Sequence, residues 1–248
     1  EHFENLFNQE DIKILEIGVS TGGSLEAISN FFQNNALVVG LERNESALNL
    51  NFKEKNIKII IGNAEDPITF KKLKKEFGLF DIIIDDGGHT NLQQLTALVC
   101  GIDLLKKGGK IIIEDTQCSY LTKFGNPSKY SMVSISKKLI DNINFRSVQI
   151  NGKLTEFPIY KIEFSCGMIT FTKSRSKKLI SKQVLNNYKN IVGPQDFRFV
   201  DKPFLKFYTN FSSIVYKHLS KYFPKFLIYI PKKIFGYFNN IVYQILLD

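Results

Sequence analysis

Short apolar runs alternate with amphipathic stretches from residue 12 to about residue 115. This alternation is typical of strand–helix–strand units. The apolar runs are almost continuous in Ile and Val, which predicts strands buried on both faces of a parallel sheet. Strands are expected at residues 12–18, 36–42, 57–62, 80–86 and 109–115, and helices at residues 24–33, 69–78 and 91–105. The pattern therefore predicts an α/β fold with a doubly wound, mostly parallel sheet.

The pattern weakens beyond residue 115. Further strands are expected at residues 147–155, with a turn at Asn151-Gly152, and at residues 159–173. Residues 176–248 contain prolines at positions 203, 224 and 231, and short helices interrupted by these prolines are expected there. This predicts a domain of residues 1–175 followed by a helical, basic and aromatic C-terminal extension of residues 176–248.

The composition places the chain among globular proteins of a reducing compartment. Hydrophobic residues make up 44% of the 248 residues and charged residues 23%, which excludes a disordered chain. The three cysteines are odd in number and widely spaced, which argues against a disulfide framework and against a cysteine zinc site. The first 18 residues lack the charged, apolar and cleavage regions of a signal peptide. The sequence contains no uncharged apolar run of about 18 residues, so no membrane-spanning helix is expected. A cytoplasmic protein is therefore expected.

Charge is distributed unevenly along the chain. The net charge is +9, but residues 1–100 hold 9 Lys or Arg against 15 Asp or Glu, whereas residues 101–248 hold 24 against 9. The basic C-terminal part is suited to a phosphorylated acceptor, to nucleic acid or to the inner face of a membrane. A solvated basic face, a segment folded onto the domain and a homo-oligomer interface are the alternatives.

A glycine-rich turn lies between the first strand and the first helix. Gly18 and Gly22 allow the backbone to approach a ligand closely, and the helix that follows offers free N–H groups. Ser20 stands where a dinucleotide-binding turn has its second glycine, which weakens a pyrophosphate interpretation. Glu16 precedes the turn and suits a positively charged ligand such as S-adenosylmethionine.

Two further strand ends carry candidate cofactor ligands. Glu42 closes the second strand and could accept both ribose hydroxyls, in S-adenosylmethionine as in NAD. Asn63 and Ala64 follow the third strand, where a polar side chain and a backbone N–H could contact an adenine edge. A plain loop is the alternative for this third site.

An acidic cluster with a histidine is expected at the ends of two neighbouring strands. Asp85, Asp86 and His89 end the strand at residues 80–86, and Glu114 and Asp115 end the strand at residues 109–115. Adjacent parallel strands bring their carboxyl ends to one edge of the sheet, about 5 Å apart. Carboxylates gathered in this way favour a hard divalent cation such as Mg²⁺ or Mn²⁺. The alternative is that the acids cap helices and that the histidine binds backbone.

Three segments of the chain, ILEIGVSTGGSL, FDIIIDDGGH and LLKKGGKIIIEDTQCSY, resemble a known group of enzymes. They are similar to class I S-adenosylmethionine-dependent methyltransferases of the macrolide-sugar O-methyltransferase and cephalosporin-hydroxylase-like family. The resemblance covers about residues 12–125, roughly half of the chain. It implies a Rossmann-like methyltransferase fold, S-adenosylmethionine as cofactor and Mg²⁺ bound beside it.

The resemblance also implies roles for individual residues. It implies a catalytic role for Asp86 and His89, with the histidine as base, and an acceptor contact at Tyr120. The implied metal ligands are Asp86, Glu114 and Asp115. The implied cofactor contacts are Glu16, Gly18, Ser20, Gly22, Glu42, Asn63, Ala64 and Asp85. The chain departs from the family at Asn63, where Asp is usual, and nothing beyond residue 125 matches.

The leading hypothesis from the sequence is metal-assisted O-methylation of a sugar hydroxyl, on a surface polysaccharide or a glycosylated metabolite. The alternatives are a metal-independent methyltransferase acting on another small or carrier-linked acceptor, an NAD-dependent oxidoreductase, and a non-catalytic protein at a membrane or in a scaffold. Methylation of nucleic acid is not expected, because the chain lacks an Asn/Asp-Pro-Pro-Tyr motif of the kind that holds a flipped base.

Overall fold

The computed structural model describes residues 9–53, 55–145 and 157–175, together with single residues near the N-terminus and between Pro203 and His218. The chain divides into two compact units, residues 1–183 and residues 184–248. The expected strand at residues 147–155 and most of the expected C-terminal helices lie outside the described residues. Within the described part, no helix is both long enough and apolar enough to cross a membrane.

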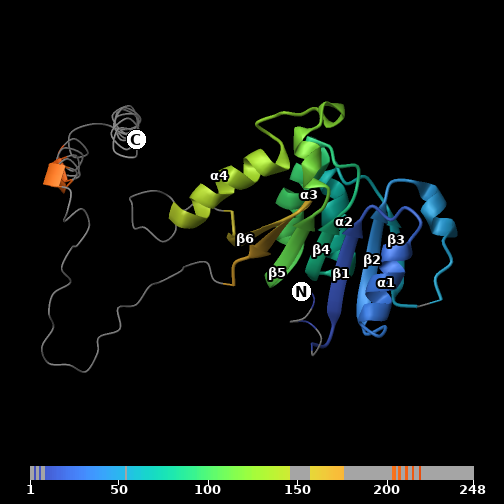
Figure 1. Cartoon of the computed structure of the whole chain (residues 1–248). Coiled ribbons are helices and arrows are strands. Elements are labelled where there is room, and N and C mark those ends of the chain that lie inside the picture. Colours follow the sequence, from blue (N-terminus) through green and yellow to red (C-terminus); the bar gives the residue numbers. More distant parts are fainter. Residues whose placement is uncertain are drawn as a thin grey trace, which may run out of the picture. The chain divides into compact units, whose positions relative to one another are not determined.

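A seven-stranded sheet with the order β3-β2-β1-β4-β5-β7-β6 forms the centre of the first unit (Figure 1). Strands β1 to β5 pair in parallel, and β7 runs antiparallel to both of its neighbours, β5 and β6. The strands are β1 (Ile12–Ile17), β2 (Ala36–Glu42), β3 (Ile57–Ile61), β4 (Phe80–Asp85), β5 (Leu105–Ile113), β6 (Ile159–Ser165) and β7 (Met168–Lys173). The predicted doubly wound, mostly parallel sheet is confirmed.

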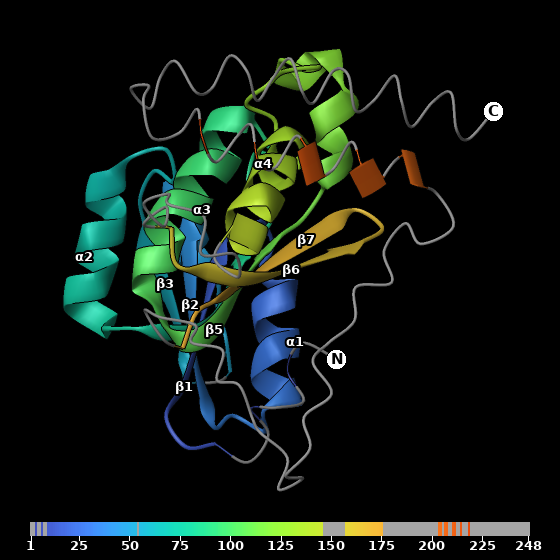
Figure 2. The ribbon, with the colours of Figure 1, turned by 90° about the vertical axis from the view of Figure 1, so that its left-hand side faces the viewer.

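Helices cover both faces of the sheet (Figure 2). Helix α1 packs on one face through Leu25 and Ile28, whereas α2, α3 and α4 contribute to the core on the other face. The helices are α1 (Gly23–Phe31), α2 (Pro67–Phe77), α3 (Asn91–Leu104) and α4 (Met132–Phe145), with short 3₁₀ helices η2 (Glu45–Asn49), η3 (Thr116–Tyr120) and η4 (Thr122–Phe124). Strands buried on both sides account for the continuous Ile and Val runs.

The structure departs from the sequence-based expectation in two elements. Strand β5 begins at Leu105 rather than at residue 109, because Leu105 pairs with Phe80 and a register shift accommodates the residues that follow. Gly108 lies there with φ of 84°, in the left-handed region that glycine tolerates. Helix α4 was not expected from the pattern, although its buried Met132 packs into the main core.

Candidate active site

The sheet order reverses between β1 and β4, and open α/β sheets bind ligands beside such a point, at the carboxyl ends of the strands. The glycine-rich turn follows β1 at this place. Gly18 has φ of 92°, and a Cβ there would collide with the backbone carbonyl of Asp86. The Asp86 N–H donates to the Ile17 carbonyl at 2.9 Å. Glycine at position 18 therefore lets the turn lie directly against the loop after β4.

Gly22 ends the turn and caps α1. It has φ of 82°, and a Cβ there would lie 2.7 Å from the ring of Phe52. No side chain caps the first turn of the helix, so its N–H groups face the space above the sheet without a side-chain acceptor. A backbone of this kind accommodates a ligand that approaches closely.

Four backbone N–H groups hold the carboxylate of Glu42 at the end of β2. Its Oε2 accepts from Val19 at 2.9 Å and from Ser20 at 3.3 Å, and its Oε1 accepts from Arg43 at 2.7 Å and from Asn44 at 3.0 Å. Partial burial raises the pKa of Glu42, but these hydrogen bonds outweigh burial, and the pKa is lowered overall. Glu42 is therefore an ionised acceptor that also fixes the glycine-rich turn.

A cleft of about 450 Å³ lies over this region. Five of the predicted cofactor contacts line it: Gly18, Ser20, Glu42, Asn63 and Ala64. The predicted contacts Glu16, Gly22 and Asp85 are buried rather than part of its lining. The cleft also contains Asp86, Gly87, Gly88 and Gln93, so it extends from the first helix to the start of α3.

Glu16 and Asp85 are both buried, each with 2% exposure. Burial raises the pKa of Glu16 to about 7, and the charges of Asp86 and Glu114 add to the increase against one hydrogen bond from Ser24. Burial also raises the pKa of Asp85 to about 7. Glu16 Oε2 and Asp85 Oδ2 have no hydrogen-bond partner among the described residues. Two carboxyl groups in such a place are suited to a cationic ligand.

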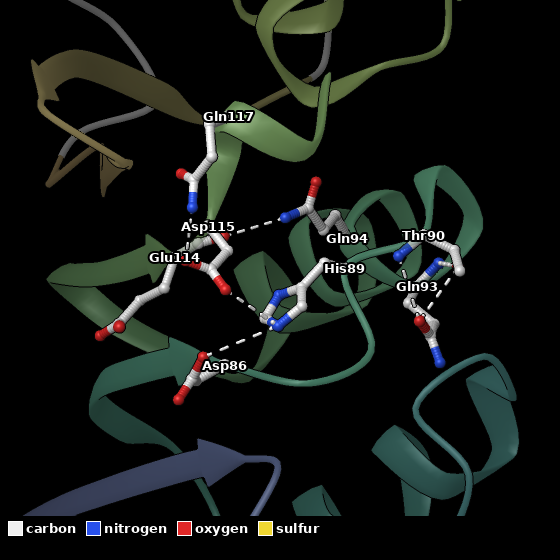
Figure 3. Close-up of polar contacts among 8 residues, drawn as sticks. All are labelled: Asp86, His89, Thr90, Gln93, Gln94, Glu114, Asp115 and Gln117. Atoms are coloured by element: carbon white, nitrogen blue, oxygen red, sulfur yellow. Dashed lines mark hydrogen bonds and ion pairs between the residues drawn. The ribbon is translucent and has the colours of Figure 1, made fainter. Parts of the chain in front are cut away.

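Asp86, His89 and Asp115 point towards one another beside the cleft (Figure 3). His89 Nε2 lies 3.2 Å from Asp115 Oδ2 and 3.9 Å from Asp86 Oδ1. One ligand atom from each of the three residues lies within 4.8 Å of the other two. The two carboxylates are about half exposed, whereas the imidazole is 18% exposed. We call these three residues the acid–histidine cluster.

Local backbone geometry places the acid–histidine cluster. His89 and Asp115 have φ of 58° and 52°, left-handed values that are uncommon outside glycine. Thr90 begins α3 with a capping box, in which it and Gln93 satisfy each other's backbone N–H groups. The buried Gln94 donates Nε2 to the Glu114 carbonyl at 3.0 Å. The end of β5 is thereby tied to α3.

Glu114 occupies a different position from the one expected. Its carboxylate points away from the imidazole (Figure 3), and it is not part of the acid–histidine cluster. It is still electrostatically coupled to the site, because burial and the charges of Asp86 and Asp115 raise its pKa. The pKa of Asp86 is also raised, first by burial and then by Asp115, against the opposing charge of His89. Metal ligation by Glu114 remains a prediction.

Three neighbours of the cluster were missed by reasoning from the sequence. Gln117 Nε2 donates to Asp115 Oδ1 at 2.8 Å, and Gln94 supports Glu114 from α3. The ring of Phe124 lies edge-on to His89, with centroids 6.3 Å apart. The I-E-D-T-Q spacing after β5 could have indicated Gln117, but nothing in the pattern indicated the other two. Tyr120, the predicted acceptor contact, ends η3 and is 67% exposed.

Comparisons with known proteins show which enzymes the chain is similar to. The chain is 30% identical to demethylmacrocin O-methyltransferase of Streptomyces fradiae and 31% identical to mycinamicin VI 2''-O-methyltransferase of Micromonospora griseorubida, each over 159 residues and 59% of this chain. The solved MycE methyltransferase of the mycinamycin pathway, in complex with Mg and SAH, superimposes with a TM-score of 0.64 at 25% identity over 75% of this chain and 50% of that one. The chain is therefore similar to these O-methyltransferases and has the fold of the MycE methyltransferase.

The homology has a limited extent. The chain spans 39% of the length of these two curated relatives. No protein-family model matches the chain. The match covers the methyltransferase fold.

Proposed function

We propose that the protein is an S-adenosylmethionine-dependent, Mg²⁺-assisted O-methyltransferase that acts on a sugar hydroxyl. One observation carries the proposal: Asp86 belongs both to the cleft lining and to the acid–histidine cluster. Cofactor and acceptor sites that share one residue can hold a methyl donor and a hydroxyl side by side. The relatives are named as O-methyltransferases, and two of the names include a glycosyl group, an L-olivosyl and a rhamnosyl.

The cleft residues fit S-adenosylmethionine. Glu42 offers an ionised carboxylate for ribose hydroxyls, and Asn63 and Ala64 line the part of the cleft after β3. Glu16 and Asp85 provide buried carboxyl groups for an ammonium or a sulfonium charge. Bound there, the cofactor supplies an activated methyl group. Alignment above the rigid strand ends then provides most of the acceleration, because the methyl donor is already reactive.

The acid–histidine cluster fits a hard divalent cation. Asp86 and Asp115 offer oxygen ligands, and their charges, together with burial, raise the pKa of Glu114. A cation held there supplies Lewis-acid chemistry that lowers the pKa of an acceptor hydroxyl. His89 would accept the proton of that hydroxyl at Nε2, the nitrogen that faces Asp86 and Asp115, because Nδ1 is buried. Phe124 packs beside the ring.

A metal-independent methyltransferase is the second candidate. The 3.2 Å contact between His89 Nε2 and Asp115 Oδ2 favours it, because this contact gives one carboxylate a partner from the protein itself. The metal-assisted and the metal-independent enzyme are distinguished by an assay of radiolabelled methyl transfer from S-adenosylmethionine to a panel of glycosides with neighbouring hydroxyls. The assay is run with and without EDTA. Loss of transfer in EDTA and its recovery with Mg²⁺ support the first candidate, and full activity in EDTA supports the second.

The histidine is tested on the same assay. We expect His89→Ala to lower methyl transfer at least a hundredfold, in line with the size of general base catalysis. Binding of S-adenosylhomocysteine is expected to stay within twofold, because His89 does not line the cleft. His218→Ala, at an exposed position of the second unit, is the matched control. Unchanged transfer in His89→Ala would exclude the proposed base.

We further propose that the acceptor is a small glycosylated molecule or a glycan precursor handled at the inner face of a membrane. The basic excess of residues 101–248 supports this location. The division into a cofactor-binding domain of residues 1–175 and an extension of residues 176–248 is part of the same proposal.

A further inference from the structure

The carboxylate of Asp115 does not cap the short helix that it precedes. Asp115 is the N-cap residue of η3, yet its side chain accepts no hydrogen bond from the backbone of that helix. Asn44, Asn63 and Asp66 behave differently, because each accepts from the backbone N–H two residues further on, at 2.9 to 3.0 Å. Such a bond to nearby backbone is the usual role of Asn and Asp at these positions. The orientation of the Asp115 carboxylate therefore has another cause.

The side chain of Gln117 takes the place of the backbone donor (Figure 3). Its Nε2 donates to Asp115 Oδ1 at 2.8 Å, while Asp115 Oδ2 faces His89 Nε2 at 3.2 Å. An ionised carboxylate can only accept, so the amide nitrogen of Gln117 must be the atom that faces it. Each carboxylate oxygen has two lone pairs, so both oxygens keep acceptor capacity for a cation.

Asp115 needs such a partner because its side chain is 48% exposed. A half-exposed side chain occupies several rotamers unless neighbours select one of them. The left-handed backbone at Asp115 sets where its Cβ points, but the contact with His89 engages only one carboxylate oxygen. The second contact, from Gln117 to the other oxygen, fixes the plane of the carboxylate.

The hairpin of β6 and β7 supports Gln117 from the edge of the sheet. Strand β7 pairs antiparallel with β5 up to Ile113, so the turn of the hairpin lies beside the residues that follow β5. The Thr116 N–H donates to the Gly167 carbonyl in this turn at 3.0 Å. Gly167 has φ of 74°, and a Cβ there would lie 3.2 Å from Gln117 Oε1. Glycine therefore lets the amide oxygen lie against the turn while the amide nitrogen faces Asp115.

We propose that Gln117 is a positioning residue, which holds Asp115 in the orientation that binds the divalent cation and faces His89. The inference rests on the metal site of the proposed function. It adds to that site a residue that lies outside the lining of the cofactor cleft. Removing a group that hydrogen-bonds a metal ligand typically lowers metal affinity or activity about 10- to 100-fold.

Binding of Mn²⁺ to the full chain, followed by electron paramagnetic resonance, tests this role. Gln117→Met keeps about the same side-chain length and removes the donor, and we expect it to bind Mn²⁺ at least tenfold more weakly. Its affinity for S-adenosylhomocysteine is expected to stay within twofold, because Gln117 does not line the cleft. Gln33→Met is the matched control, since it makes the same substitution at another exposed position of the first unit. Its affinity for Mn²⁺ should stay within twofold.

A double variant shows whether Gln117 acts through Asp115. Adding Gln117→Met to Asp115→Asn should weaken Mn²⁺ binding by less than twofold beyond Asp115→Asn alone, because the interaction is already lost. Gly167→Ala, whose Cβ would press on the Gln117 amide, should also weaken Mn²⁺ binding. Its control is Gly78→Ala, with a similar φ of 77°, where a Cβ would approach only Lys13 Nζ at 3.9 Å.

The outcomes separate this inference from the proposed function. Equal Mn²⁺ affinity of Gln117→Met and the unaltered protein would overturn the inference and leave the metal site intact. Losses that add in full in the double variant would overturn it as well, because Gln117 would then act independently of Asp115. If the unaltered chain binds no Mn²⁺, the metal site itself is wrong and the inference is wrong with it. Methyl transfer that persists in EDTA would then identify the metal-independent enzyme.

Discussion

Replacing Glu16 by glutamine removes a buried carboxyl group from beneath the candidate cofactor cleft. Its pKa is raised from 4.5 to about 7 in the folded protein. Between these values the folded state keeps a proton that the unfolded chain has lost, so the stability of the unaltered protein falls as the pH rises through this window. Glutamine resembles the protonated carboxyl group and has no such dependence. Glu16→Gln is therefore expected to be the more stable protein above pH 7.

The size of the effect follows from the shift in pKa. A raise of this extent corresponds to about 3 kcal/mol at pH 8, and to nearly nothing at pH 4.5. Urea unfolding of both proteins without ligand, at pH 5 and at pH 8, measures the difference. Glu45→Gln removes an exposed carboxylate from η2 and is expected to change the free energy of unfolding by less than about 0.5 kcal/mol.

The affinity of Glu16→Gln for the methyl donor is expected to fall, whereas its stability is expected to rise. If Glu16 neutralises a cation, Glu16→Gln binds S-adenosylmethionine at least tenfold more weakly by calorimetry, although the protein itself is more stable. Such a gain in stability with a loss of binding is typical of groups retained for function. Two results would refute this explanation. One is that Glu16→Gln is no more stable than the unaltered protein at pH 8, and the other is that its gain in free energy of unfolding is as large at pH 5 as at pH 8.

Three further substitutions test other parts of the site. Gly18→Ala is expected to lose at least 2 kcal/mol in urea unfolding and to lose binding of S-adenosylhomocysteine, because its Cβ meets backbone and its φ of 92° disfavours alanine; intact binding would contradict the close approach. Asp115→Asn should weaken binding of Mn²⁺, followed by electron paramagnetic resonance, at least tenfold; equal affinity would remove this residue from the metal site. Gln94→Ala leaves the part-buried Glu114 carbonyl without its donor and should cost about 1–3 kcal/mol in unfolding free energy; its control, Gln93→Ala, tests the capping box instead.

The arrangement of strands could be predicted from the sequence because each strand is a nearly unbroken apolar run. The run at Ala36–Glu42 was located with both ends correct. Helix α4 was overlooked because Ser, Lys and Asn separate its apolar residues, although Met132, Ile135, Leu139 and Ile143 follow helical spacing. The bulge in β5 depends on pairing with β4, which only the assembled sheet determines.

The members of the acid–histidine cluster could be named from the sequence, but their mutual orientation could not. Strand ends that are neighbours in the sheet bring Asp86 and Asp115 to one edge, and this much follows from topology. Which carboxylates face the imidazole depends on left-handed backbone at His89 and Asp115, and neither residue type requires that conformation. This is why Glu114, expected beside them, has its carboxylate turned away while Asp115 takes the contact.

The place where the sheet order reverses explains why so many acids gather there. Strand β4 lies between β1 and β5, so its carboxyl end is the one point that touches both the glycine-rich turn and the end of β5. Asp85 lies buried at this point, and Asp86 follows it at the surface of the cleft. Burial raises the pKa of both, and the charges of Asp86 and Glu114 add to the increase at Asp85, as that of Asp115 does at Asp86. A cationic cofactor on the β1 side and a divalent cation on the β5 side would each relieve that repulsion. The unfavourable free energy of gathering these carboxyl groups is then offset only when both ligands are bound. The metal, the methyl donor and the acceptor would therefore bind side by side at the carboxyl ends of β1, β4 and β5.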